Sequence, residues 1–283
     1  MILPATRRLL QVFSCLTLLA FLTLFVMSAR TDRYFAWTIA PPITAAFLGA
    51  AYAAGCVIVV LALRIGDWTR VRVPYITILV FTLITLVATV LHRDRFHFGS
   101  DLALARFAAW FWMVVYVVVP VGMLLMLLLQ ERRRNDQTWP RLPLPRLLSA
   151  VLILQGGVLL IVGTSLFVAP STAAMVWPWP LTPLTARVVA AWLVAFGLAA
   201  VLAYRDADLR RLDLAAWAYA ALGALELVVV LRYAGVVRWS SVAAWVYLLI
   251  AASILASSGY VLLGTGRDPE PVAPPSPLDR RSP

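Results

Sequence analysis

The stretch Leu9–Ala29 reads LLQVFSCLTLLAFLTLFVMSA, which is 21 consecutive residues without a charged side chain. A helix rises about 1.5 Å per residue, so this stretch is long enough to cross a hydrocarbon core of about 30 Å. Seven further apolar stretches of similar length follow, at residues 43–63, 75–91, 103–129, 147–168, 184–204, 214–231 and 242–263. The sequence therefore predicts eight transmembrane helices.

The composition of the 283 residues supports this interpretation, because 63% are hydrophobic, 13% are charged and the mean hydropathy is +0.89. Soluble domains are about 45–50% apolar and about 25% charged. Lipid offers no partner for backbone N–H and C=O groups, and the apolar stretches lack the alternation of barrel strands. The predicted fold class is an all-α polytopic helical membrane bundle, which excludes a secreted enzyme and a nucleic-acid-binding domain.

Prolines mark most of the predicted helix boundaries. A proline in the first turn of a helix loses no hydrogen bond, so a helix start is expected at or just after five of them, namely Pro41, Pro42, Pro74, Pro145 and Pro183. Pro120 lies inside the fourth stretch, where a kink is expected.

The arginines predict the orientation of the chain. All 24 basic residues are arginine. Sixteen of them fall in one set of alternate loops and termini and five in the other set, while Arg106, Arg187 and Arg232 lie at the edges of spans. Basic residues concentrate on the cytoplasmic side of membrane proteins. We therefore expect a bacterial inner membrane protein with both termini in the cytoplasm.

The sequence matches itself when position 42 is placed on position 183, which is a shift of about half the chain. Between positions 42 and 72 there are 11 identities in 31, including Asp67 with Asp208 and Arg70 with Arg211. A duplication would give a tandem parallel repeat of four helices each, related by an axis along the membrane normal. The expected units are residues 1–141 and 142–263, followed by a disordered cytoplasmic tail at 264–283. Similar helix entries before arginine-rich loops are the alternative explanation.

Glu226 is the most costly residue of the predicted membrane interior, since a carboxylate there costs about 2.5–3.5 kcal/mol on insertion scales. Four other candidates for a ligand or an ion pair are predicted at the same, outer depth of the bilayer: Arg187, Arg106, Arg232 and His92. Glu226 with Arg187 or Arg106 is the expected buried ion pair. The alternatives are a purely structural contact between helices and an outward-facing polar pocket between the repeats. The two histidines have no metal-ligand spacing, and no motif indicates a cofactor.

Two loops are expected to contact lipid. The loop at 169–183 contains Trp177 and Trp179, and these indoles are predicted to belong to an interfacial aromatic belt, or else to a lid over an external pocket. On the cytoplasmic side, Arg132, Arg133 and Arg134 are expected to attract anionic lipid headgroups. Cys15 and Cys56 fall inside spans and are expected to be unpaired.

Two segments carry a resemblance. FAWTIAPPITAAFLGA at 35–50 and, more loosely, WPLTPLTAR at 179–187 resemble short stretches of uncharacterised multi-pass membrane proteins of actinobacteria, and this covers about a tenth of the chain. The resemblance implies no activity, cofactor or catalytic residue.

Two functions remain open after these observations. The first is a small permease or ligand-binding membrane protein with a polar site around Glu226 in the outer half of the bilayer. The second is a non-enzymatic accessory or scaffold subunit whose polar residues only join helices. An enzyme ranks last, because the sequence shows no arrangement of a nucleophile and a base.

Overall fold

The computed structural model describes residues 1–133 and 142–265. Eight helices in this part of the chain are long and apolar enough to cross a membrane, as expected. The first is α1 (Pro4–Phe21), which continues as the π-helical turn η1 (Leu22–Val26). The others are α3 (Pro42–Ile65), α4 (Trp68–Leu91), α5 (Ala103–Arg132), α6 (Arg146–Val168), α8 (Pro183–Asp206), α9 (Asp213–Arg232) and α10 (Val242–Thr265). The chain is an integral membrane protein with an all-α polytopic fold.

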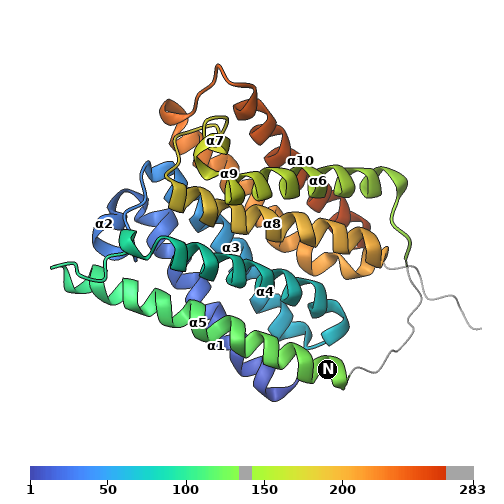
Figure 1. Cartoon of the computed structure of the whole chain (residues 1–283). Helices are drawn as coiled ribbons and strands as arrows, with labels where there is room; N and C mark the ends of the chain where they lie inside the picture. The colour runs from blue at the N-terminus through green and yellow to red at the C-terminus, as the bar shows by residue number, and fades with distance from the viewer. Residues whose placement is uncertain (134–141, 266–283) are drawn as a thin grey trace, which may run out of the picture.

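Short helical turns occupy the connections between the spans. Two are α-helical turns, α2 (Thr31–Tyr34) and α7 (Pro170–Ala173). Four are 3-10 turns, namely η2 (Ser28–Arg30), η3 (Arg93–Arg95), η4 (Leu209–Arg211) and η5 (Ala234–Val236). In Figure 1, α2 lies at the left of the bundle, and α7 lies higher, near the left end of α6.

Local sequence explains where the helices begin, with one correction. Pro42 and Pro183 stand in the first turns of α3 and α8, as predicted, and Thr182 and Thr185 form a reciprocal capping box on α8. The prediction that α4 begins at Pro74 is wrong. Asp67 accepts a hydrogen bond from the backbone N–H of Thr69 and starts α4 at Trp68, so Pro74 lies inside the helix.

Hydrogen bonds and ion pairs between distant segments define two opposite ends of the bundle. At the aromatic end, Ala36 accepts from the backbone of His97, and Pro178 accepts from the backbone of Arg238. At the arginine end, the side chain of Gln130 joins the N-terminus to the end of α5, while Arg70 pairs with Asp213. The chain runs between these two ends eight times.

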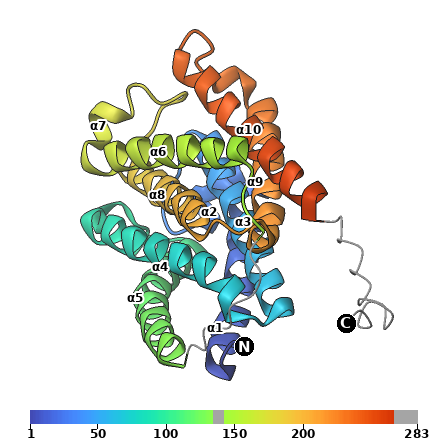
Figure 2. The same cartoon turned by 90° about the vertical axis from the view of Figure 1, so that its right-hand side faces the viewer.

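The helices α3 and α8 form the centre of the bundle (Figure 2). Every residue from Ile43 to Gly55 of α3 is buried, and so is most of α8 from Leu184 to Ala195. Their alanines, glycines and threonines let neighbouring helices approach closely. The outer helices α1, α5, α6 and α10 show much less burial and present leucines and valines outward, as expected of surfaces that face lipid.

The two halves of the chain have matching helix neighbours. Helix α3 packs on α1 as α8 packs on α6, and α5 packs on α4 as α10 packs on α9. Between the halves, α3 packs on α9 and α8 packs on α4. The left-handed backbone positions follow the same pattern, because Gly66 (φ 64°) ends α3 and Ala207 (φ 48°) ends α8. The shift that places Pro42 on Pro183 also places Gly66 on Ala207.

The interpretation of the tryptophans as an interfacial belt is wrong. Trp37, Trp177 and Trp179 are buried among other side chains of the aromatic end. The rings of Trp177 and Trp179 pack on each other and on Phe47, and the ring of Trp37 packs on Phe96, so the three indoles stabilise the loops from inside the protein.

Some predictions fall partly or wholly outside the described residues. Arg134 lies in the undescribed segment 134–141, which also contains the boundary between the two expected units, and the predicted tail lies outside from residue 266 onward. Cys15 and Cys56 lie within α1 and α3, and both are free thiols.

Candidate functional site

Glu226 lies on α9, nearer to the aromatic end, and its side chain is only 4% exposed. Its Oε2 atom accepts a hydrogen bond from the hydroxyl group of Tyr247 on α10, at 2.6 Å. Its Oε1 atom is buried and has no hydrogen-bond partner among the described residues. One turn earlier, Gly223 lets α10 approach closely, because a Cβ atom there would lie 3.0 Å from the carbonyl oxygen of Ala251. The carboxyl group is therefore held at one oxygen and unsatisfied at the other.

A cavity of about 390 Å³ adjoins this carboxyl group, and we name it the Glu226 cavity. Side chains of α6, α8, α9 and α10 and of the loop at 173–178 form its wall. The site was expected between the two halves, but Phe47 of α3 is its single lining residue from the described part of the first half. Most of the wall is apolar, and its polar groups are those of Glu226, Tyr247 and Ser165 and the unpartnered indole N–H group of Trp177.

The most exposed residues of the Glu226 cavity's lining lie on α6, on α10 and in the loop before α8. They include Ile161, which is 69% exposed, and Val242, which is 77% exposed. Such exposed apolar side chains on a membrane span face acyl chains, because lipid surrounds the bundle at this level. The cavity therefore opens sideways toward the lipid.

Arg187 and His92 form a contact of their own, away from Glu226. The guanidinium group of Arg187, at the start of α8, donates to the carbonyl oxygen of Phe167 at 3.0 Å, and its Nη1 atom lies 2.5 Å from Nε2 of His92. Burial, together with the adjacent Arg187 cation, lowers the pKa of His92. The neutral imidazole then accepts the hydrogen bond from Arg187. This contact joins the end of α4 to the start of α8.

The expected ion pair of Glu226 with Arg187 or Arg106 does not occur among the described residues. Arg106 is exposed at the start of α5 and donates to the carbonyl oxygen of Ser100. Arg232, at the end of α9, donates to the carbonyl oxygen of Phe25 at 2.8 Å. These arginines bind main-chain carbonyls at the aromatic end, so the buried carboxyl group has a tyrosine as its partner instead.

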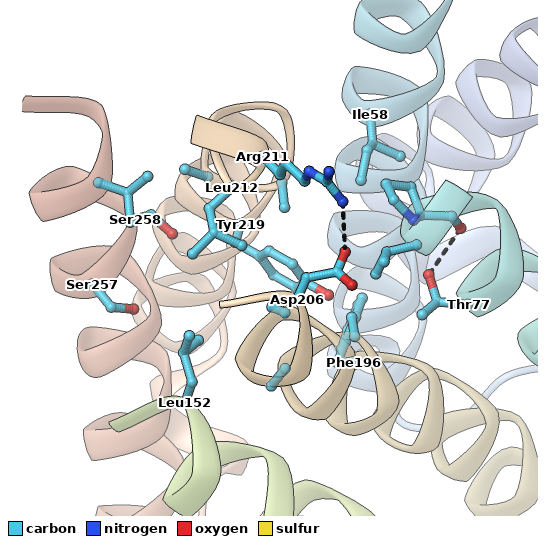
Figure 3. Close-up of a pocket in the computed structure, with 18 of the residues that line it drawn as sticks. Ile58, Thr77, Leu152, Phe196, Asp206, Arg211, Leu212, Tyr219, Ser257 and Ser258 are labelled. Atoms are coloured by element: carbon cyan, nitrogen blue, oxygen red, sulfur yellow. Dashed lines mark hydrogen bonds and ion pairs between the residues drawn. The ribbon is translucent and has the colours of Figure 1, made fainter. Parts of the chain in front are cut away.

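A second, narrower cavity of about 90 Å³ lies at the arginine end, and we name it the Tyr219 cavity. Figure 3 shows the ring of Tyr219 in this cavity, near Phe196 and the ion pair of Arg211 with Asp206. Tyr219 precedes Glu226 by two helical turns, which places both side chains on one face of α9. Three side chains line both cavities, namely Leu159, Phe196 and Ile254.

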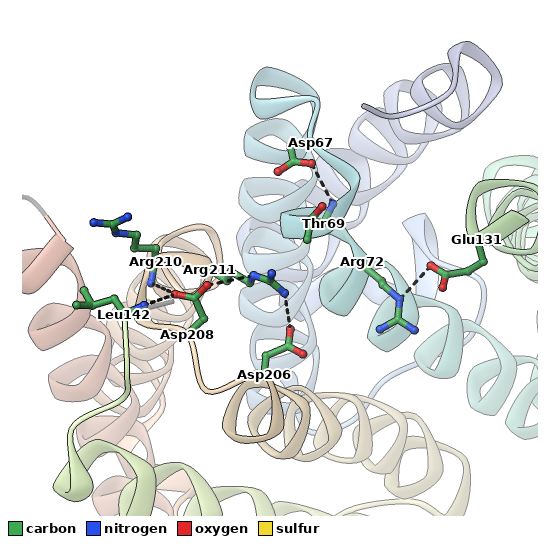
Figure 4. Close-up of polar contacts among 9 residues, drawn as sticks. All are labelled: Asp67, Thr69, Arg72, Glu131, Leu142, Asp206, Asp208, Arg210 and Arg211. Atoms are coloured by element: carbon green, nitrogen blue, oxygen red, sulfur yellow. Dashed lines mark hydrogen bonds and ion pairs between the residues drawn. The ribbon is translucent and has the colours of Figure 1, made fainter. Parts of the chain in front are cut away.

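Charged side chains lie at the side of the Tyr219 cavity that faces the loops of the arginine end. Asp208 accepts hydrogen bonds from the backbone of Leu142 and Arg210, and it pairs with Arg211 at 3.2 Å (Figure 4). Arg72 binds Glu131 at 2.9 Å and so joins α4 to α5. These contacts hold the loops together at the arginine end.

Sequence reasoning missed the tyrosines. Tyr247 holds Glu226, and in the first half the hydroxyl oxygens of Tyr52 and Tyr116 lie 2.5 Å apart. All three side chains lie well inside predicted spans, whereas tyrosine is enriched at the membrane interface. A hydroxyl group at that depth needs a partner, and this signal could have marked all three.

Arg132 and Arg133 are exposed at the end of α5, as contact with lipid headgroups requires. No group of three metal-ligating side chains occurs within residues 1–133 and 142–265.

Comparisons of the chain with family models, curated proteins and solved structures found no match. The resemblance to actinobacterial membrane proteins therefore stays a prediction.

Proposed function

We propose that the protein binds a membrane-soluble ligand in the Glu226 cavity and acts as a small permease. The observation that carries this proposal is the buried Oε1 atom of Glu226, which lacks a hydrogen-bond partner in the described structure and adjoins an apolar cavity. A buried oxygen without a partner is costly, and a ligand that donates a hydrogen bond to it would remove that cost.

The wall of the cavity indicates the chemistry of the ligand. A volume of about 390 Å³ is within the range of small-molecule sites, which combine apolar walls with a few polar groups. An alkyl chain would fill the apolar part, and an ammonium or hydroxyl group would donate to Oε1 of Glu226. The sideways mouth admits such a molecule from the lipid phase.

The succession of cavities along α9 supports transport in addition to binding. The Glu226 cavity and the Tyr219 cavity share Leu159, Phe196 and Ile254 in their linings. A ligand that passes these three apolar side chains would move from the aromatic half of the protein toward the arginine end. In the described state the shared side chains separate two spaces of very different size.

Binding can be tested with 8-bromooctylamine, whose bromine quenches tryptophan fluorescence. Trp177 lines the cavity, so the difference in quenching between the wild type and Trp177→Phe reports this site. We expect Glu226→Gln to weaken the binding about tenfold or more, since charge-assisted hydrogen bonds are the strong ones. Asp101→Asn removes an exposed carboxylate at the same end and serves as the matched control. Equal binding by wild type and Glu226→Gln would refute the proposal.

A transport test uses hexyltrimethylammonium, which carries a permanent charge and crosses lipid slowly by itself. Vesicles that contain the protein should take up this cation faster than empty vesicles, and Glu226→Gln should remove the difference. Uptake equal to that of empty vesicles would leave binding without transport and would contradict the permease part of the proposal.

The second candidate is a non-enzymatic accessory or scaffold subunit. The hydrogen bond from Tyr247 to Glu226 favours it, because this contact joins α9 to α10. A purely structural role predicts that Tyr247→Phe and Glu226→Gln both reduce the yield of folded protein, with no response to the amine. It also predicts that a partner protein co-purifies in mild detergent.

We also propose which membrane holds the protein and which end of the bundle faces the cytoplasm. The arginine end is assigned to the cytoplasm of a bacterial cell, where Arg132, Arg133 and Arg134 attract anionic headgroups. In a chain without its two native cysteines, the thiol that Arg133→Cys introduces should react with an impermeant maleimide only after the cells are lysed. Reaction in intact cells would reverse the orientation.

A further inference from the structure

The first half of the chain contains a cavity of about 350 Å³, which we name the Tyr116 cavity. Its wall comes from α1, η1, α2, α3, α4 and α5. The Glu226 cavity is formed by the corresponding elements of the second half, which are α6, α7, α8, α9 and α10. Each half therefore encloses a cavity of similar size between the same set of helices.

The two cavities also correspond residue by residue. The shift that places Pro42 on Pro183 also places positions of the first lining on positions of the second, as in Thr17 with Val158, Tyr52 with Leu193, and Thr82 with Gly223. On the last helix of each half the correspondence is offset by two positions, and positions 104, 107, 108, 111, 112 and 115 recur at 243, 246, 247, 250, 251 and 254. The two cavities therefore share lining positions as well as lining helices.

The polar groups of the two cavities differ in their hydrogen-bonding chemistry. Tyr52 and Tyr116 are buried and line the first cavity, with their hydroxyl oxygens 2.5 Å apart. The pair has two hydroxyl protons, and their mutual hydrogen bond uses one of them. The other proton has no acceptor within the described residues. The Tyr116 cavity can therefore donate a hydrogen bond, whereas Glu226 can accept one.

Eight of the nineteen residues that line the Tyr116 cavity are aromatic. The ring centroids of Trp112 and Tyr116 lie 4.3 Å apart, and Phe35 packs against Trp112 at 5.3 Å. At the mouth, Phe107 is 63% exposed and Leu19 is 50% exposed, so this cavity also opens toward lipid. Flat aromatic walls favour a flat, conjugated ligand.

We propose that the Tyr116 cavity is a second ligand site, which takes a lipid-soluble conjugated carbonyl compound and donates a hydrogen bond from the Tyr52–Tyr116 pair to its oxygen. This proposal extends the ligand binding proposed for the Glu226 cavity to the first half, and it assigns the opposite hydrogen-bonding role to the second site. The two halves then bind different ligands at equivalent places.

The test uses the full chain in lipid vesicles and two probes with the same alkyl chain and diazirine group. One probe carries a fully substituted benzoquinone, which cannot add to Cys15, and the other carries a benzene ring. After irradiation, peptide mass spectrometry locates the adducts. We expect the benzoquinone probe to label peptides of α5 or α1 about tenfold more strongly than the benzene probe does.

Variants of the tyrosine pair separate binding from a structural role. Tyr52→Phe and Tyr116→Phe each leave one hydroxyl group without its partner, so each single variant should keep the preference for the benzoquinone. The double variant lacks both hydroxyl groups of the pair, so the two probes should label it equally. Loss of the preference in both single variants, or its persistence in the double variant, would overturn the proposal.

The variant Glu226→Gln distinguishes a failure of the proposed Glu226 site from a failure of the proposed Tyr116 site. It should leave the benzoquinone adduct on α5 unchanged while it weakens the binding of the bromoamine. The reverse result, with loss of benzoquinone labelling in Glu226→Gln, would contradict two independent sites.

Discussion

The contact between α1 and α3 in the first half differs from the contact between α6 and α8 in the second half. In the second half, α6 and α8 meet at Gly156 and Gly197, where a Cβ atom on Gly197 would lie 2.9 Å from the carbonyl oxygen of Gly156. In the first half, the equivalent positions are Cys15 and Cys56, and the thiol of Cys56 lies 3.7 Å from the carbonyl oxygen of Ser14. The same pair of helices can thus be joined with or without side chains at the contact, which indicates different tolerance of mutation.

The largest effect is expected from Gly197→Val. The added side chain would meet the backbone of α6 and force the two helices apart, at a cost of about 3 kcal/mol. Cys56→Val is the matched control at the equivalent place and should cost less than about 1 kcal/mol, since a side chain already fills it. Thermal unfolding in mild detergent measures both. Equal losses of stability would remove the difference between the two contacts.

A smaller effect is expected at the paired aspartates that follow α3 and α8. Asp208 is buried and holds Arg211 and two backbone N–H groups, while Asp67 caps α4 by accepting from the backbone N–H of Thr69. Asp208→Ala should destabilise the protein by about 2–3 kcal/mol, because it removes a buried carboxylate on which Arg211 and two backbone N–H groups converge. Asp67→Ala should cost about 1 kcal/mol, the value of a helix cap. The same unfolding assay compares them, and the opposite ranking would contradict the network in Figure 4.

Substitutions at the two left-handed positions, Gly66 and Ala207, are expected to change the stability in opposite directions. Gly66→Ala should destabilise the protein by about 1 kcal/mol, because its Cβ atom meets no neighbour and the penalty comes from the backbone alone. Ala207→Gly should stabilise the protein by about 0.5–1 kcal/mol, as the strain at φ 48° is relieved. Unfolding midpoints of the two variants should move in opposite directions. A shift in the same direction would mean that the two turns differ in more than their residue.

The smallest effect is a dependence on pH at the aromatic end. The lowered pKa of His92 means that the folded protein favours the neutral ring. The stability from its contact with Arg187 is therefore present above the unfolded pKa of about 6.5 and is lost as the pH falls below it. Tyr233 is the equivalent residue of the second half, and its hydroxyl group lies 2.6 Å from that of Ser28. Unfolding midpoints measured from pH 7.5 to 5 should fall less in His92→Gln than in the wild type, and Tyr233→Phe should keep the wild-type slope.

The fold could be predicted because burial in lipid imposes one requirement on every span. Long uncharged stretches must form helices there, and the predicted ends agree with the described ones to within a few residues at most boundaries. The starts of α4 and α1 are the exceptions, and residues next to each start determine where the helix begins. Asp67 starts α4 before Pro74. Pro4 starts α1, so Arg7 and Arg8 lie inside this helix, although the first uncharged stretch begins only at Leu9.

The candidate site could be predicted in part. The free-energy cost of placing a carboxyl group in the membrane interior was enough to predict Glu226 as a site residue, because such a group must be buried in the bundle or have a partner. Its partner could not be found, because depth along a helix does not tell which neighbour faces it. Arg187 and Tyr247 were both available at a similar depth, and only the packing of α10 against α9 favours the tyrosine. Likewise, the burial of Trp179 depends on its hydrogen bond to Thr44, which is far away in the sequence.

The contacts of α3 with α9 and of α4 with α8 have a consequence for biosynthesis. The ribosome delivers α3 and α4 to the membrane before their partners have been made. Until the second half has been made, the buried hydroxyl group of Thr44 on α3 lacks its partner, the indole N–H of Trp179. The packing of α3 and α4 is therefore completed only after α8 and α9 have entered the membrane.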